Sequence, residues 1–502
     1  MERSRIRRGG DMRAADIARI NPTATETEAE TAPEAGPVVP EIPISRTLAD
    51  FATSLRYEDI PRPVLERAKH LILDAVGIAL ASTRWDFAHK TATALQGLGG
   101  PGPSTVFGLP LRLPLRDAVL LNGTLVHGLD YDDTHVPGII HATASTWPCA
   151  FGLAEAHGLS GRDLLAAYIV GIETGARLGA VARGAFHQVG FHPTGLIGTY
   201  ACTLLAGRLT GATPQQLRHA QGIALSTGAG SMEFLEDGAW TKRLHPGWAG
   251  VCGITNAALA KQGFQGPVLA YEGRFGLFPS HLGPALAGCD YGLATADLGE
   301  VWELEQVAVK PFPACHFAHA AADCALALHT QMQQQGLRPE EVRTITVKVP
   351  AEVIKTICEP VAKKRRPVSD YDAKFSVQFI VAAALLRGRF GLAELEPLAL
   401  SDPAILSLTD KVSYEADPAS LFPRAYSGEV VVTLHDDRTL QHREAVNRGA
   451  AERPLSNAEI AEKYAQTATL AVSPTHAATI REALLTLDTH ETMAVLSAVL
   501  RG

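Results

Sequence analysis

Residues 195–207 read Gly-Leu-Ile-Gly-Thr-Tyr-Ala-Cys-Thr-Leu-Leu-Ala-Gly, a run of small and apolar side chains that ends at Arg208. As a helix, this run would rise only about 20 Å, which is too short to cross a bilayer core of about 30 Å. We therefore predict a helix buried in a protein core rather than a membrane span, and we expect no membrane partner.

The sequence on both sides of this run also favours helices. Residues 144–230 are rich in Ala, Gly, Leu and Thr, and apolar residues recur at helical spacing from Thr47 onwards. These patterns predict a large all-helical domain built from residues 46–302 and 451–502. Helix starts are marked by a capping residue followed three positions later by an acid or an amide, at Ser160 and Asp163, Thr213 and Gln216, and Ser456 and Glu459.

The sequence between these two parts has a different pattern. Alternation at 345–349 and at 430–434 predicts strands, because successive strand side chains point to opposite faces. Residues 375–386 are apolar and rich in Ala, which predicts a helix packed on that sheet. The expected fold class is mainly α, with a smaller α+β domain at 303–450 inserted into the helical domain.

The N-terminal segment differs from both. Five arginines occur in the first 13 residues without an apolar run behind them, so this is not a secretory signal. Residues 21–45 hold five Glu, five Pro and no basic residue, a composition that cannot bury enough surface to offset chain entropy. We predict a disordered leader over residues 1–45.

Composition excludes several classes of protein. The 502 residues include 45 Lys and Arg against 53 Asp and Glu, and this net charge of −8 gives no basic surface for nucleic acid. The seven cysteines are scattered and never spaced as C-x-x-C, which fits neither a disulfide framework nor a zinc site. A cytoplasmic location, where thiols stay reduced, is expected.

Polar clusters interrupt the apolar sequence at five places, and charged loops between buried elements often carry function. Together they supply carboxylate, imidazole and ammonium groups, the groups of acid–base chemistry. No dinucleotide, Walker or G-x-S-x-G motif accompanies them, so the sequence predicts no organic cofactor and no metal. The clusters are residues 122–135, His141, residues 190–195 with His192, residues 237–247 with Lys242, Arg243 and His245, and residues 310–316.

Other interpretations of these clusters stay open. If residues 122–135 are helical, His127, Asp130 and Thr134 share one face, and the stretch could equally be a helix end capped by aspartates. His192 could be a core histidine, and the basic cluster could be a solvated loop rather than a carboxylate clamp. A divalent metal of a hydrolase is a further alternative, held by Asp130, Asp132, Asp133 and His135.

In order along the chain, the motifs at 122–135, 242–245 (Lys-Arg-Leu-His), 263–267 (Gly-Phe-Gln-Gly-Pro) and 310–313 (Lys-Pro-Phe-Pro) closely resemble those of the MmgE/PrpD family. That family includes 2-methylcitrate dehydratase, cis-aconitate decarboxylase and iminodisuccinate epimerase. The resemblance spans about residues 45–500. It implies a helical domain with an inserted α+β lid, a homodimer, and an active site between the domains that needs no metal or cofactor.

The resemblance also implies roles for single residues. Lys310 is similar to a substrate-binding lysine, Cys315 or His316 takes the next substrate-binding place, and Arg243 and His245 join them from the basic cluster. Tyr371 does not clearly match the decarboxylase's active-site tyrosine. The catalytic residues implied are Asp130, Thr134, His141, His192 and Lys242.

The expected function is a cofactor-independent lyase that moves a proton at a carbon next to a carboxylate. Its substrate would be a small di- or tricarboxylate like 2-methylcitrate or cis-aconitate, which it would dehydrate or decarboxylate. Asp132 and His135 stand where methylcitrate dehydratases have Asn and Trp, which counts against that exact activity. An epimerase of an iminodisuccinate-like dicarboxylate and a non-catalytic carboxylate-binding protein are the alternatives.

Overall fold

The apolar run lies at the centre of the helical part of the chain. In the computed structural model, which describes residues 36–501, it forms helix α8 (Pro193–Leu209), whose side chains are buried from Pro193 to Gly207. Helices α6 (Gly161–Val181) and α11 (Thr241–Lys261) pack against it. The prediction of a buried core helix is confirmed. Helix α6 is also long and apolar enough to cross a membrane, but 94% of its apolar window is buried inside the protein.

Helix α4 (Leu115–His127) crosses α11 at two glycines. A Cβ atom on Gly123 would lie 2.5 Å from the Cα atom of Gly247, closer than any side chain tolerates. Both positions therefore need glycine for close approach. This contact fixes the distance between α4 and the helix that carries Lys242.

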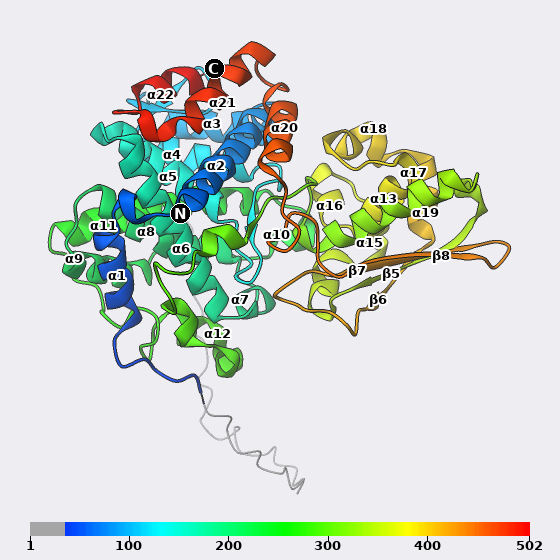
Figure 1. The fold of residues 1–502 in the computed structure, drawn as a ribbon, viewed down its shortest axis with the longest axis horizontal. Helices are drawn as coiled ribbons and strands as arrows, with labels where there is room; N and C mark the ends of the chain where they lie inside the picture. The colour runs from blue at the N-terminus through cyan, green and yellow to red at the C-terminus, as the bar shows by residue number, and fades with distance from the viewer. Residues whose placement is uncertain (1–35, 502) are drawn as a thin grey trace, which may run out of the picture. The chain divides into compact units, whose positions relative to one another are not determined.

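The remaining long helices complete the helical core, and all three predicted capping boxes are present. Helices from the C-terminal end pack on α2 (Arg62–Ser82), as the blue and red ribbons of Figure 1 show. The core helices are α1 (Ile44–Ser54), α3 (Asp86–Gly99), α5 (Ala142–His157), α9 (Pro214–Ala224), α20 (Asn457–Ala468), α21 (Pro474–Leu485) and α22 (Ala494–Leu500).

The predicted strands and helix of the α+β segment are confirmed. Strands β5 (Val342–Val349), β6 (Val412–Ala416), β7 (Gly428–Leu434) and β8 (Thr439–Glu444) form one sheet in the order β6-β5-β7-β8, with β5 and β6 parallel. Helix α13 (His319–Gln334) packs on this sheet, and α17 (Val377–Arg387) packs on α13 (Figure 1). A second hydrophobic core lies between sheet and helices.

The fold is mainly α, as expected, and the domain boundaries stay a prediction. Most of the predicted leader, residues 1–35, lies outside the described residues. Helix α1 begins at Ile44, so the last two residues of the predicted leader belong to this helix. The main-chain amide of Ile44 donates to Glu272 Oε1 at 3.2 Å, and both Ile44 and Ser45 are buried.

Candidate active site

The motif at residues 122–135 does not form one helix. Helix α4 ends at His127, and Thr134–His135 forms a short strand, β3, that pairs with β4 (Val307–Ala308). This pairing overrides helical spacing, so the expected helical face of His127, Asp130 and Thr134 is wrong. Asp130, in the loop between, has φ +52°, a left-handed conformation that aspartate tolerates better than most residues. The β3–β4 pairing brings Asp130 to Lys310.

Asp130 lies between two lysines. Its Oδ1 atom is 2.6 Å from Lys310 Nζ, and its Oδ2 atom is 2.8 Å from Lys242 Nζ. Burial alone would raise the pKa of Asp130, but the two ammonium groups hold it well below its usual range. Burial alone would lower the pKa of Lys310, but the neighbouring charge of Asp130 outweighs this effect, and the pKa of Lys310 is raised. The trio therefore carries one net positive charge, which suits a substrate carboxylate.

The hydrogen bonds of His141 define which ring nitrogen is free. Its Nδ1 atom lies 2.6 Å from the carbonyl oxygen of Asp133, and a carbonyl only accepts, so Nδ1 carries the proton. The Nε2 atom is then an unprotonated base. Burial, followed by the charge of Lys310, lowers the pKa of His141 well below its usual value, which keeps the ring neutral.

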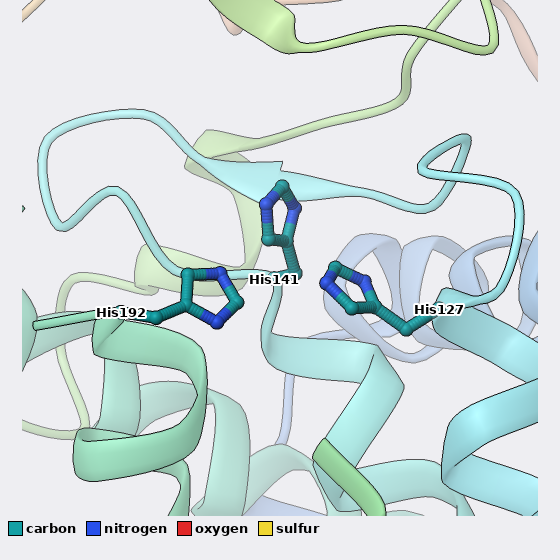
Figure 2. A group of neighbouring side chains, drawn as sticks. All are labelled: His127, His141 and His192. Carbon is teal, nitrogen blue, oxygen red and sulfur yellow. The ribbon is translucent and has the colours of Figure 1, made fainter. Parts of the chain in front are cut away.

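Two more histidines lie beside His141 (Figure 2). The ring centroids of His127 and His141 are 4.8 Å apart, and those of His127 and His192 are 5.6 Å apart. His192 Nδ1 lies 3.0 Å from His245 Nδ1, so one ring donates to the other. Burial lowers the pKa of His245 to about 4, so this pair is neutral at pH 7. His192 immediately precedes α8 and His141 immediately precedes α5, so both rings lie at helix N-termini.

These groups line a small, partly open chamber with a cavity volume of about 30 Å³. That volume holds a water molecule or two, far less than a tricarboxylate, so the walls must move apart to admit one. Polar and apolar side chains both line it. The polar lining is Asp130, Thr134, His141, His187, His192, Lys242, Cys315, His316 and Thr356, and the apolar lining is Ile139, Met232, Phe234, Leu235, Phe317, Phe375 and Tyr426.

His316 is the main polar group from the α+β segment. The side-chain oxygen of Asn447 accepts from the main-chain amide of Tyr426 at 3.3 Å, which turns its nitrogen toward His316 Nε2 at 2.7 Å. Because that amide nitrogen can only donate, His316 Nε2 accepts and Nδ1 carries the proton. The Nδ1 atom is buried and has no protein partner, so it is a donor free for a ligand.

The structure brings seven of the ten predicted site residues to the chamber wall and leaves three behind it. Lys310 is fully buried behind Asp130, and His245 contacts His192. Arg243 points away from the chamber, since its Nε atom donates to the carbonyl of Gly128 at 2.8 Å and its guanidinium lies over the Tyr371 ring. Contact of Arg243 with substrate stays a prediction. Residues 242 and 243 face different ways because consecutive helical residues point about 100° apart.

Two features of the site were missed by sequence reasoning. The hydroxyl of Tyr371 is buried without a partner, and its pKa is raised well above the usual value by burial and then by the nearby charge of Asp130. His127 is paired with Asp132, with 2.7 Å between Nδ1 and Oδ2. The presence of His127 in the motif could have indicated a further site histidine, but no sequence rule predicts that it pairs with Asp132.

The metal hydrolase alternative is not supported by the geometry. Asp130 binds lysines, Asp132 binds His127, Asp133 accepts from Thr143, and His135 lies 2.8 Å from Glu303. Among residues 36–501, the only group with ligand spacing is His127, His141 and His192, whose nitrogens lie within 4.8 Å of one another. Lys242 lowers the pKa of each of these rings, and the same positive charge disfavours a dication there.

Fold and site together describe a helical protein suited to acid–base chemistry on a small anion. The MmgE/PrpD N-terminal domain model matches residues 46–287, and the MmgE/PrpD C-terminal domain model matches residues 312–489. The chain belongs to the MmgE/PrpD family.

Curated relatives carry the names of two lyase activities. The chain is 30% identical over 471 residues to cis-aconitate decarboxylase of Homo sapiens, covering 91% of this chain and 95% of that protein. It is 27% identical over 484 residues to a cis-aconitate decarboxylase-like protein of Aspergillus oryzae, covering 92% and 98%. It is 24% identical over 390 residues to 2-methylcitrate dehydratase of Salmonella typhimurium, covering 73% and 76%. The relatives are thus decarboxylases and dehydratases of small carboxylates.

Proposed function

We propose that this protein is a cofactor-independent lyase that acts on a small tricarboxylate or dicarboxylate. The observation that carries the proposal is the chamber lined by Asp130, Lys242 and His141, in which Lys242 pairs with Asp130 and the Nε2 atom of His141 is unprotonated. In this proposal, Lys242, supported by Lys310 behind Asp130, attracts a substrate carboxylate, and His316 donates to a second one. Thr134, whose hydroxyl lies 3.1 Å from His141 Nδ1, helps to orient that ring.

The proposed chemistry is proton transfer at a carbon next to a carboxylate. In dehydration, neutral His141 or His192 would take the proton as the C–H bond breaks, and the hydroxyl on the neighbouring carbon would leave as water with a proton from the imidazolium so formed. In decarboxylation, loss of CO₂ would leave a carbanion that takes a proton from an imidazolium. Bound substrate carboxylates would favour that imidazolium, because nearby negative charge raises a histidine pKa. The lysines would stabilise the developing charge in either case.

Decarboxylation is the favoured reaction of the two. The decarboxylase relatives align with about nine-tenths of the chain, whereas the Salmonella dehydratase aligns with 73% of it. Asp132 and His135 also depart from the dehydratase form of the motif. Epimerisation of an iminodisuccinate-like dicarboxylate is the second candidate, since it would use the same proton transfer. A non-catalytic binder would have no need of an unprotonated histidine beside the cations.

Proton NMR in deuterated water tests the proposal. The enzyme is incubated with cis-aconitate, 2-methylcitrate or iminodisuccinate, with and without a chelator. We expect deuterium in the product next to a carboxylate, equal rates in both arms, and a product that identifies the reaction. Loss of turnover in chelator would contradict cofactor independence. Binding of carboxylates in a thermal-shift assay without any exchange or turnover would indicate the non-catalytic binder.

We also propose that the protein is a homodimer that uses α11. Leu244, Trp248 and Leu259 lie on the solvent side of this helix and are 40%, 44% and 39% exposed, beside Trp240 at 43%. Exposed apolar side chains at helical spacing mark an interaction face. Light scattering should give twice the mass of one chain, and Trp248→Glu should give monomers. A wild-type monomer at micromolar concentration would contradict this assignment.

A cytoplasmic location is proposed as well. All seven cysteines are free and buried in the structure, as suits a reducing compartment. We expect neither nucleic acid nor membrane among the partners.

A further inference from the structure

His127 is a third histidine of the site that does not line the chamber. Its side chain is fully buried at the end of α4, behind the rings of His141 and His192. Figure 2 shows the three rings turned toward a common centre. A residue in this place acts on the reaction only through its neighbours, so it would be a positioning residue.

Asp132 determines the tautomer of His127. A carboxylate only accepts, so the 2.7 Å contact places the proton of His127 on Nδ1. Nε2 then has a lone pair, and it is buried with no protein partner. Although burial would raise the pKa of Asp132, His127 and then His141 hold it well below its usual value, so the carboxylate stays charged. The pair thus presents an acceptor, with a full negative charge behind it, to two neutral histidines.

Apart from Asp130 and Asp132, the groups around His127 are positive or neutral. Lys242 opposes protonation of all three rings, and Lys310 opposes that of His141. A base that takes a proton here becomes an imidazolium beside two ammonium groups. Asp130 is already shared by those lysines, so Asp132 is the second carboxylate that offsets the new charge. The charged and titratable groups that face His127 are Asp130, Asp132, Lys242, His141, His192 and His245.

We propose that Asp132 and His127 form a positioning pair that stabilises the imidazolium formed on His141 or His192 during turnover. In dehydration this cation forms when the substrate C–H bond breaks and an N–H bond forms at Nε2, and its proton then leaves with the substrate hydroxyl as water. In decarboxylation the imidazolium gives its proton to the carbanion left by loss of CO₂. In both cases the lone pair of His127 and the charge of Asp132 stabilise the cation. The inference rests on the proposed lyase function and deepens it. It explains a buried histidine–carboxylate pair that does not line the chamber.

The pH dependence of kcat/KM tests the pair. Asp132→Asn removes the negative charge, so the apparent pKa of the catalytic histidine should fall by about one unit. This pKa sets the acid limb if the histidine is a base, as in dehydration, and the alkaline limb if its imidazolium is the acid, as in decarboxylation. Turnover at pH 7 should fall about tenfold, because the histidine holds a proton less readily. His127→Gln should shift the limb in the same direction. Glu303→Gln is the matched control, since it alters another histidine–carboxylate pair at 2.8 Å that does not line the chamber.

An unshifted limb for the catalytic histidine in a folded Asp132→Asn enzyme, or an equal shift in Glu303→Gln, would overturn the inference. A second measurement needs neither turnover nor a variant that folds. In ¹⁵N-labelled wild-type protein, the Nδ1 proton of His127 should resonate far downfield because of its carboxylate partner. A His127 protonated on Nε2 instead would also overturn the pair. Absence of turnover in the wild type alone would count against the proposed lyase, not against this proton assignment.

Discussion

The helical part and the α+β segment line one chamber with different chemistry. Helix ends and the loop after α4 supply the charged and basic groups, Asp130, Lys242 and the histidine cluster. The segment after residue 312 supplies neither a carboxylate nor a lysine to the described lining; its residues there are Cys315, His316, Phe317, Thr356, Phe375 and Tyr426. This difference suggests that the helical part carries out proton transfer and that the α+β segment determines how the substrate fits. Changes on the helical side should alter kcat, and changes on the α+β side should alter KM.

The largest effect should come from the base on the helical side. His141→Asn should lower kcat about a thousandfold, which is in the range for loss of a general base, with little change in KM. Steady-state kinetics on the substrate identified by NMR measures both. His70→Asn is a matched control, because His70 is also buried and its Nδ1 also contacts a main-chain carbonyl, at 2.7 Å. A rise in KM at constant kcat would show that His141 binds substrate and does not transfer the proton, which would contradict the division between the two sides.

A smaller effect is expected across the chamber at Asn447. Asn447→Asp replaces the donating nitrogen with an acceptor, so the proton of His316 should move from Nδ1 to Nε2. The substrate would lose a donor, and KM should rise about tenfold, as expected for a lost hydrogen bond to a charged group. The ¹⁵N shifts of His316 report the tautomer directly. An altered kcat with an unchanged tautomer would show that the α+β side does more than bind.

The helical side should also make stability depend on pH. Burial raises the pKa of Asp133 to about 7, so the folded protein binds a proton that the unfolded chain releases near its ordinary pKa of about 4. Stability should therefore fall as pH rises through 7, by about 1 kcal/mol between pH 6 and pH 8 from this group. Denaturant midpoints of wild type and Asp133→Asn measure this share. An equal pH dependence in both would contradict the buried protonated carboxyl.

The smallest effect should come from the apolar wall. Phe317→Leu enlarges the chamber on the α+β side, and it should change KM by about threefold while kcat stays within about twofold, as single pocket contacts do. Comparing cis-aconitate with a methyl-substituted analogue would show whether the added space favours the bulkier substrate. A large fall in kcat with an intact thermal transition would place Phe317 among the groups that position the base.

Local signals in the sequence were sufficient for most of the fold. A capping box such as Ser160 with Asp163 is complete within four residues, so it can be identified without knowing the rest of the molecule. The parallel pairing of Ile345 with Val412 is not encoded nearby, since those residues meet only when the intervening helices have packed. Alternation predicted the strands but not their order.

In the site, too, local signals were predictable from the sequence and long-range contacts were not. The motif residues Asp130 and His141 were expected and lie at the chamber. The side chains that they contact depend on the conformation of the loop after His127. There the chain leaves α4 and forms β3, which pairs with β4. Helical spacing assumed for residues 122–135 therefore missed the contact between His127 and Asp132. The orientation of Arg243 away from the chamber depends on the rotation of α11 about its axis, which only packing against α4 and α8 determines.

The crossing of α4 and α11 at Gly123 and Gly247 has a consequence for protein engineering. The backbones of the two helices meet directly at Leu120, Gly123 and Gly247, with no side chain between them. Substitutions that change a side-chain size gradually therefore cannot shift one helix relative to the other. The crossing therefore holds Asp130 and Lys242 at a fixed distance from each other, and any substrate carboxylate that binds there must fit that distance. New substrate preferences, in directed evolution or in nature, should arise on the α+β side, where side chains of graded size are available for exchange.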